Sequence, residues 1–211
     1  MKSLPRVNNY DILTQTAHGS IQYSCKTKFL QLNELIKYSN KKAFDMLCKQ
    51  GCPNYGKKWS CPPYAPAFEH FVKPFIFIQV IMLLVEMGEF SYIKNDYLKI
   101  NAANSVLKSR IDKALRLCMD NNEFYISTGS CRLCKPCKKK FNEKCSHPEK
   151  RTYSFEALGI NVSAMIQDLF QTKLLWYKSK TLPEYTCVVA GLLTNCEEIN
   201  DKVVKQLMQF D

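Results

Sequence analysis

The spacing of four cysteines near the middle of the chain constrains this protein more than any other feature of its sequence. Cys131, Cys134 and Cys137 recur at every third residue, and Cys145 follows after seven intervening residues. Three thiols at this spacing lie on one tight wrap of backbone, from which they can reach different irons of a cubane, and a later cysteine can occupy the fourth corner. We therefore expect residues 129–148 to form a loop that binds a 4Fe–4S cluster.

Zinc is the main alternative to iron for this loop. A single Zn²⁺ needs ligands that converge from two sides, so zinc sites more often use two separated C-x2-C pairs, or one pair with histidines. The cysteines could instead be reduced thiols without metal, or be joined by disulfides. The pattern predicts a metal site and favours an iron–sulfur cluster over zinc.

The meaning of the eleven cysteines depends on the cellular compartment. Residues 1–10 contain no apolar core that would indicate an export signal. The longest apolar run, residues 75–87, is interrupted by Gln79 and Glu86 and is too short to cross a bilayer as a helix. An odd number of cysteines in clustered spacings then favours metal-binding thiols over disulfides. We expect a cytoplasmic protein that does not contact a membrane.

The formal net charge of +11 suits an anionic partner such as a nucleic acid, a nucleotide or an acidic electron carrier. No nucleic-acid-reading motif accompanies the charge, so nucleic acid has weak support as a partner. Cations around the first cysteine group would favour the thiolate form that binds metal. These cations are Arg132, Lys135, Lys138, Lys139, Lys140 and Lys144.

Hydrophobic periodicity predicts a single domain over residues 1–211, with an α/β or α+β fold. A small central sheet would be flanked by helices and would carry the cysteine-rich loops. Residues 1–19 show little periodicity, which predicts an irregular arm or a short strand, and the N-terminal arm is expected over residues 1–24. The predicted strands cover residues 75–85, 123–127 and 185–193. The predicted helical segments are residues 28–48, 65–71, 92–119, 154–170 with a break at Gly159, and 201–210. Residues 28–48 fit either two helices separated near 38–40 or one long helix.

A second group of cysteines, Cys48, Cys52 and Cys61, is followed at once by two prolines. The prolines stiffen residues 52–66, so this loop can hold thiols without regular structure beneath them. A cluster held by three protein thiolates leaves one iron open, and that iron could bind a water, a sulfur or a substrate. Alternatively, these thiols pack over the first loop or help to bind one shared cluster.

Residues near the second group suggest that it is the functional one. Tyr55, Trp59 and Tyr64 can wall off one side of the site and contact a bound molecule. Lys57 and Lys58 add positive charge for an anionic ligand.

Cys25 and His70 are the nearest candidates for a fourth ligand of the second group, although a lone histidine is more often a packed or surface residue. The remaining cysteines are interpreted as structural. Cys118 lies on the apolar face of a predicted helix and Cys187 in a predicted strand, where free cysteine behaves as a small hydrophobe. Cys196 lies in a polar turn and could be either structural or functional.

Three sequence motifs together resemble one known family. They are CPNYGKKWSCPP at residues 52–63, GSCRLCKPC at 129–137 and CSHPEKRTYSFEALGINV at 145–162. The chain is similar, over roughly residues 45–195, to cysteine-rich prokaryotic proteins that are labelled predicted metal-binding proteins. The resemblance implies a metal or iron–sulfur role in anaerobic bacteria and archaea, and it supplies no reaction. It also implies that the family's cysteines are Cys48, Cys52, Cys61, Cys131, Cys134, Cys137 and Cys145.

The sequence leaves several function classes open. In the first, the protein performs redox or cluster-based chemistry on a small anionic or sulfur-containing substrate. In the second, it passes electrons to a redox partner protein as an accessory subunit of an anaerobic enzyme system. It could also be an RNA-binding or RNA-modifying iron–sulfur protein, or a structural zinc protein. Two complete four-cysteine sites would favour electron transfer, whereas a three-cysteine site in a pocket would favour catalysis.

Overall fold

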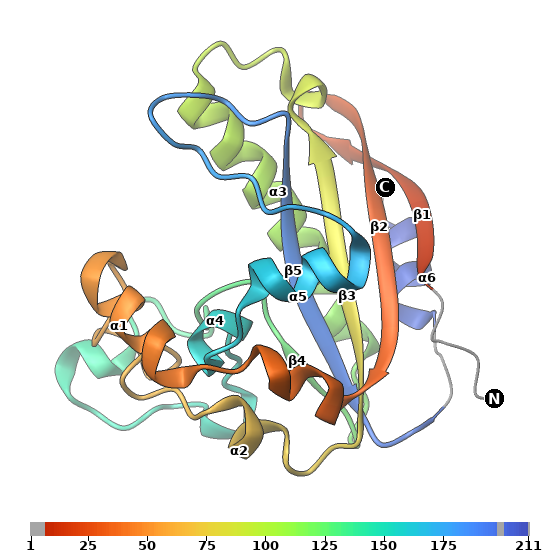
Figure 1. The fold of residues 1–211 in the computed structure, drawn as a ribbon. Coiled ribbons are helices and arrows are strands. Elements are labelled where there is room, and N and C mark those ends of the chain that lie inside the picture. The colour runs from red at the N-terminus through yellow and green to blue at the C-terminus, as the bar shows by residue number, and fades with distance from the viewer. Residues whose placement is uncertain (1–6, 198–200, 211) are drawn as a thin grey trace.

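The computed structural model describes residues 7–197 and 201–210. Its centre is a five-stranded sheet in the order β1-β2-β3-β5-β4, in which every neighbouring pair is antiparallel (Figure 1). The predicted small central sheet is therefore confirmed, and its pairing makes the fold α+β. The strands are β1 (Asn8–Thr16), β2 (Gly19–Gln31), β3 (Phe77–Glu86), β4 (Phe124–Ile126) and β5 (Tyr185–Thr194).

Helices cover both faces of this sheet (Figure 1). One face is covered by α3 (Asp96–Cys118) and α6 (Lys202–Met208). The other is covered by the 3-10 helix η1 (Leu32–Tyr38), α2 (Phe68–Val72), α4 (Phe155–Leu158) and α5 (Val162–Phe170). The remaining helices are α1 (Lys41–Gly51), η2 (Met87–Phe90), η3 (Lys138–Phe141) and η4 (Pro148–Lys150). Across the described residues, we find no helix with the length and apolar character that crossing a membrane requires.

The sequence of β3 is a nearly continuous apolar run because the side chains of this strand alternate between two buried faces of the sheet. Successive residues of a strand point to opposite faces, and here both faces are buried beneath helices. The side chains that face α3 and α6 are Ile81, Leu83 and Val85. Those that face η1, α4 and α5 are Ile78, Val80 and Met82.

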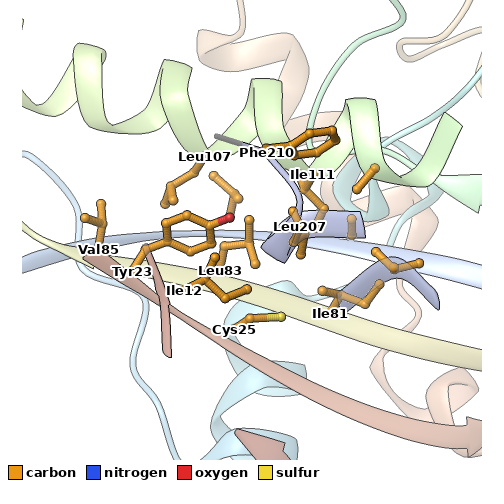
Figure 2. Close-up of a cluster of buried hydrophobic side chains, with 14 of the residues drawn as sticks. Ile12, Tyr23, Cys25, Ile81, Leu83, Val85, Leu107, Ile111, Leu207 and Phe210 are labelled. Carbon is orange, nitrogen blue, oxygen red and sulfur yellow. The ribbon is translucent and has the colours of Figure 1, made fainter. Parts of the chain in front are cut away.

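The N-terminal part of the chain forms a long hairpin, β1–β2, rather than the irregular arm or the single short strand that was expected there. Residues 1–6 lie outside the described part. In β2, Ile21, Tyr23 and Cys25 alternate with polar residues, so one face of the hairpin is apolar. Figure 2 shows Tyr23 and Cys25 packed with Ile12 of β1 in the core beneath α3.

The helical segment expected over residues 28–48 begins later than predicted. Residues 28–31 complete β2, and η1 and α1 follow as two helices separated at residues 39–40, which is the first of the two alternatives expected for this segment. The predicted break at Gly159 is also confirmed, because Gly159 ends α4 with a φ of 98°. The backbone N–H of Asn40 donates to the Gly159 carbonyl at 2.7 Å, which docks the start of α1 on the end of α4.

Candidate metal centre

The second cysteine group begins on α1. The side chain of Asn40 caps the start of this helix by accepting from the Ala43 N–H at 3.1 Å. Cys48 lies in the last turn, and the backbone N–H of Cys52 donates to the Cys48 carbonyl at 3.0 Å just beyond the helix end. Helix α1 therefore fixes the backbone of two of the three thiols, at the end of the molecule where α4 also lies (Figure 1).

Residues 52–66 form an irregular loop that is closed by its own backbone hydrogen bonds. The Gly56 N–H donates to the Pro62 carbonyl at 2.9 Å, and the Cys61 N–H donates to the Lys58 carbonyl at 3.1 Å. Cys61 is buried, whereas Cys52 is exposed. The loop therefore has a fixed shape without regular secondary structure, as the prolines predicted.

Three hydrogen bonds join this loop to the loop that carries the first cysteine group. The backbone N–H of Cys131 donates to the buried Oγ of Ser60 at 3.0 Å. Lys58 Nζ donates to Ser130 Oγ at 2.8 Å. The indole Nε1 of Trp59 donates to the Glu143 carbonyl at 2.9 Å. Two loops that are about seventy residues apart in sequence thus form one unit.

Lysines of the Cys131 loop contribute to the same packing. Lys139 Nζ lies 5.1 Å from the ring centroid of Trp59 and 4.6 Å from that of Tyr64. Cations this close to an aromatic face are attracted by the ring quadrupole. Lys138 pairs with Glu143 at 2.8 Å. Of the residues that were predicted to contact a ligand, Trp59 and Tyr64 therefore pack against Lys139, and Lys58 donates to Ser130.

Burial shifts the pKa values of thiols in the second cysteine group. Burial raises the pKa of Cys48 to about 11, and Cys52 and Cys61 add smaller contributions in the same direction. Burial also raises the pKa of Cys61, which is close enough to Cys137 to interact with it electrostatically. Cys61 therefore links the second group to the first.

The other side of the Cys131 loop lies against buried tyrosines. The backbone N–H of Ser127 donates to the Tyr153 carbonyl at 2.8 Å and leads the chain out of β4 toward the cysteines. Burial raises the pKa of Tyr153, and Cys145 and Cys131 add to that shift. Both ends of the four-cysteine loop are thus close to one buried phenol.

A buried carboxylate on α3 lies near the same loop. Burial raises the pKa of Asp112, and the nearby cations Arg116 and Arg132 oppose that shift. Arg132 belongs to the Cys131 loop and lines the same small pocket as Asp112, whose Oδ1 has no hydrogen-bond partner within the described residues. Sequence reasoning missed Asp112, and it also missed Ser60. Neither residue stands out from its neighbours, because Ser60 lies in a polar, proline-rich loop and Asp112 lies between Arg110 and Lys113.

All seven predicted ligands are free thiols, and all except Cys52 are at least partly buried. Within the described residues, no three or more His, Cys, Asp or Glu side chains are grouped so that they could hold a metal ion. Thiolates are soft donors that suit zinc and iron–sulfur clusters, so the chemistry of the donor set fits either metal.

The other sulfur and histidine candidates lie elsewhere. Cys25 is fully buried in the core on the α3 face, whereas Ala65, at the end of the second loop, belongs to the core on the opposite face (Figure 2). The expectation that Cys25 could close the second group is therefore wrong. His70 is exposed on α2. Cys118 Sγ donates to the Lys202 carbonyl at 3.3 Å, in agreement with a structural role.

The segment that contains both loops is also the segment that matches a known family. Residues 34–193 match the family described as Predicted metal-binding protein (DUF2284). The chain belongs to this family. Its membership confirms the resemblance seen in the three cysteine-containing motifs, and the family description names neither a metal nor a reaction. No curated protein and no solved structure matches the chain.

Proposed function

We propose that this member of the predicted metal-binding family is an iron–sulfur protein, with Cys131, Cys134, Cys137 and Cys145 as the ligands of a 4Fe–4S cluster. The observation that carries the proposal is the junction between the two cysteine loops, where Ser60 holds the backbone of Cys131. This junction fixes the start of a loop whose ligand spacing suits a cubane. The half-buried position of the four thiols also limits contact with solvent.

Cys48, Cys52 and Cys61 supply three further thiolates beside this cluster. Because Cys25 lies in the core, a cluster bound by these three has one iron without a cysteine of its own group. When bound, such a cluster supplies Lewis-acid or one-electron chemistry at the free iron. The chain's own part is to hold Cys61 buried and to cover the junction with the Trp59 and Tyr64 rings, which lie 5.0 Å apart.

This arrangement supports cluster-based or redox chemistry on a small anionic or sulfur-containing substrate. One observation favours a second function, which is electron transfer to a partner protein. Cys61 and Cys137 interact electrostatically, so clusters on the two groups would be close enough to exchange electrons. The lysines at residues 138 and 139 are engaged in packing the loops, so they add little support for binding to nucleic acid.

The decisive experiment is anaerobic purification followed by analysis of iron, zinc and acid-labile sulfide. Two cubanes predict about eight irons and eight sulfides per chain. The double variant Cys52→Ala/Cys61→Ala should lose about four irons and leave the absorption spectrum of the remaining cluster intact. The Cys196→Ala variant is the matched control, because Cys196 is exposed and lies outside both loops.

Different outcomes would redirect the proposal. Stoichiometric zinc without sulfide would replace the iron–sulfur assignment with a structural zinc site. Loss of all iron in both Cys52→Ala/Cys61→Ala and Cys131→Ala/Cys134→Ala would indicate one shared cluster. Unchanged iron in Cys52→Ala/Cys61→Ala would show that the second group holds no metal. A salt-sensitive gel shift of tRNA would favour a protein that acts on nucleic acid.

A further inference from the structure

A cavity of about 350 Å³ lies along an unpaired stretch of the sheet edge. Strand β4 pairs only with residues 191–193 of β5, so the edge of β5 at residues 186–189 faces this cavity instead of another strand. Helix α3 forms one wall, and residues 174–177, which belong to the segment that arches from α5 to β5 in Figure 1, form the opposite wall. The volume is in the range of small-molecule sites.

The α3 wall carries a row of polar groups at helical spacing. Asn101, Asn104 and Lys108 are separated by three and four residues, so they lie on one side of the helix. Asn104 Oδ1 accepts from Thr186 Oγ1 at 3.0 Å, which orients its amide so that the NH₂ group remains available to donate. The NH₂ group has no hydrogen-bond partner within the described part of the chain.

Among the described residues, Lys108 is the only lysine that lines this cavity. Its side chain is half-buried, and it makes no hydrogen bond or ion pair with any other residue that the structure describes. Burial lowers the pKa of Lys108 and Arg132 lowers it further, whereas Glu156 and Asp112 oppose the shift from a distance. A half-buried cation without a direct partner loses part of its hydration, and an anion that enters the cavity would offset that cost.

The opposite wall is aromatic. Trp176 is 60 % exposed, although a large apolar side chain is more stable when it is covered. Tyr177 lies with its ring centroid 6.0 Å from that of Tyr97 on α3, so two aromatic rings meet across the mouth of the cavity. These rings can pack against the apolar part of a small molecule.

Glu156 of α4 connects the cavity to the candidate metal centre. It lines the cavity near Lys108, and it also interacts electrostatically with Cys48. The negative charge of Glu156 limits how much negative charge a ligand can carry in the part of the cavity near Lys108. A dianionic phosphate would need more donors than one lysine and one amide, whereas a monoanionic carboxylate needs fewer.

We propose that this cavity binds a small organic carboxylate, with its carboxylate held by Lys108 and the Asn104 amide and its apolar part against Trp176 and Tyr177. The inference goes beyond the metal centre, because none of these groups is a predicted metal ligand. If the metal centre is catalytic, a carboxylate bound in the cavity lies close to that centre, because Glu156 borders both sites.

Isothermal titration calorimetry of the full chain with three probes of equal length tests the proposal. The probes are 4-phenylbutanoate, its neutral amide and the corresponding amine. We expect the carboxylate to bind at least tenfold more tightly than the amide, and the amine to bind most weakly. In Lys108→Met the carboxylate should lose this advantage, whereas Lys108→Arg should retain most of it.

The matched control is Lys99→Met, because Lys99 lies on the same helix and does not line the cavity. Equal binding of carboxylate and amide to the unmodified protein, or an unchanged preference in Lys108→Met, would overturn the proposal. Tighter binding of phenyl phosphate than of the carboxylate would overturn the assigned ligand class. Metal content is measured on the same samples and should not change in Lys108→Met, so the result is separate from the test of the metal centre.

Discussion

Replacing Gly159 with alanine tests whether the contact between α4 and α1 positions the second cysteine group. Gly159 has a φ of 98°, a backbone conformation that L-residues with a side chain rarely adopt. A Cβ atom at this position would also lie 2.6 Å from the Cα of Lys41 and 2.9 Å from its backbone nitrogen. Both atoms belong to the first residue of α1, so they can move only if the helix moves.

The two effects contribute separately to the expected loss of stability. The strained backbone costs about 1–3 kcal/mol. Insertion of an atom into a closely packed contact adds about 1–3 kcal/mol. We therefore expect Gly159→Ala to lower the free energy of unfolding by about 2–6 kcal/mol, which is a large part of the stability of a typical domain.

Gly19→Ala separates these two effects. Gly19 has a φ of 115° in the β1–β2 turn, and a Cβ at this position would meet nothing within 4 Å. This variant should therefore show the backbone strain alone, about 1–3 kcal/mol. The difference between the two variants measures the contact with α1.

Urea denaturation followed by circular dichroism gives the free energy of unfolding of each variant, and metal analysis gives the occupancy of the site. Because α1 carries Cys48, displacement of the helix in Gly159→Ala should also reduce the metal held by the second group, whereas Gly19→Ala should keep it. A Gly159→Ala protein no less stable than Gly19→Ala, with full metal content, would refute the reasoning.

Three further predictions concern the loops and the core. Ser60→Ala should lower the free energy of unfolding by about 1–3 kcal/mol in urea, because it leaves the Cys131 N–H without its partner, whereas Ser146→Ala at an exposed position should have little effect. Trp59→Phe removes the hydrogen bond to the Glu143 carbonyl and should cost about 1 kcal/mol and speed metal loss to a chelator; an unchanged rate would show that this bond does not hold the loop. Burial raises the pKa of Cys25 from 9.0 to about 12, so its contribution to stability is complete below pH 9 and is lost as the pH rises toward 12. In this range one such thiol lowers the free energy of unfolding by about 1.4 kcal/mol per pH unit, and Cys25→Ala should remove that part of the slope in urea titrations at about pH 8–11.

The sequence predicted the elements whose apolar residues follow one strong period. Strands β3 and β5 and helix α3 lie close to their predicted ranges, because each buries a continuous run or a regular helical stripe. The β1–β2 hairpin was missed because only one of its faces is buried. Thr14 and Thr27 take buried positions on that face, so the alternation of apolar and polar residues is interrupted in both strands.

The cysteine motifs predicted which residues could bind metal and not how they are brought together. The junction depends on hydrogen bonds that join Ser60 and Trp59 to residues more than seventy positions away, and no local pattern encodes such a contact. The cavity depends in the same way on Lys108 and Glu156, which come together only through the packing of α3 and α4 around the sheet. That these two residues line one cavity follows from the topology, and local periodicity in the sequence does not predict it.

The shortness of β4 links the binding cavity to the cysteine loops. β4 has three residues, whereas its neighbour β5 has ten. Two more residues of β4 in the same register would stand opposite Ala190 and Val189, and would cover part of the edge that lines the cavity. They would also shorten the segment between the end of β4 and Cys131, and that segment allows Cys131 to reach Ser60. A more regular sheet and an assembled cysteine junction therefore compete for the same residues, and a mutation that extended β4 should stabilise the sheet while it impairs both sites together.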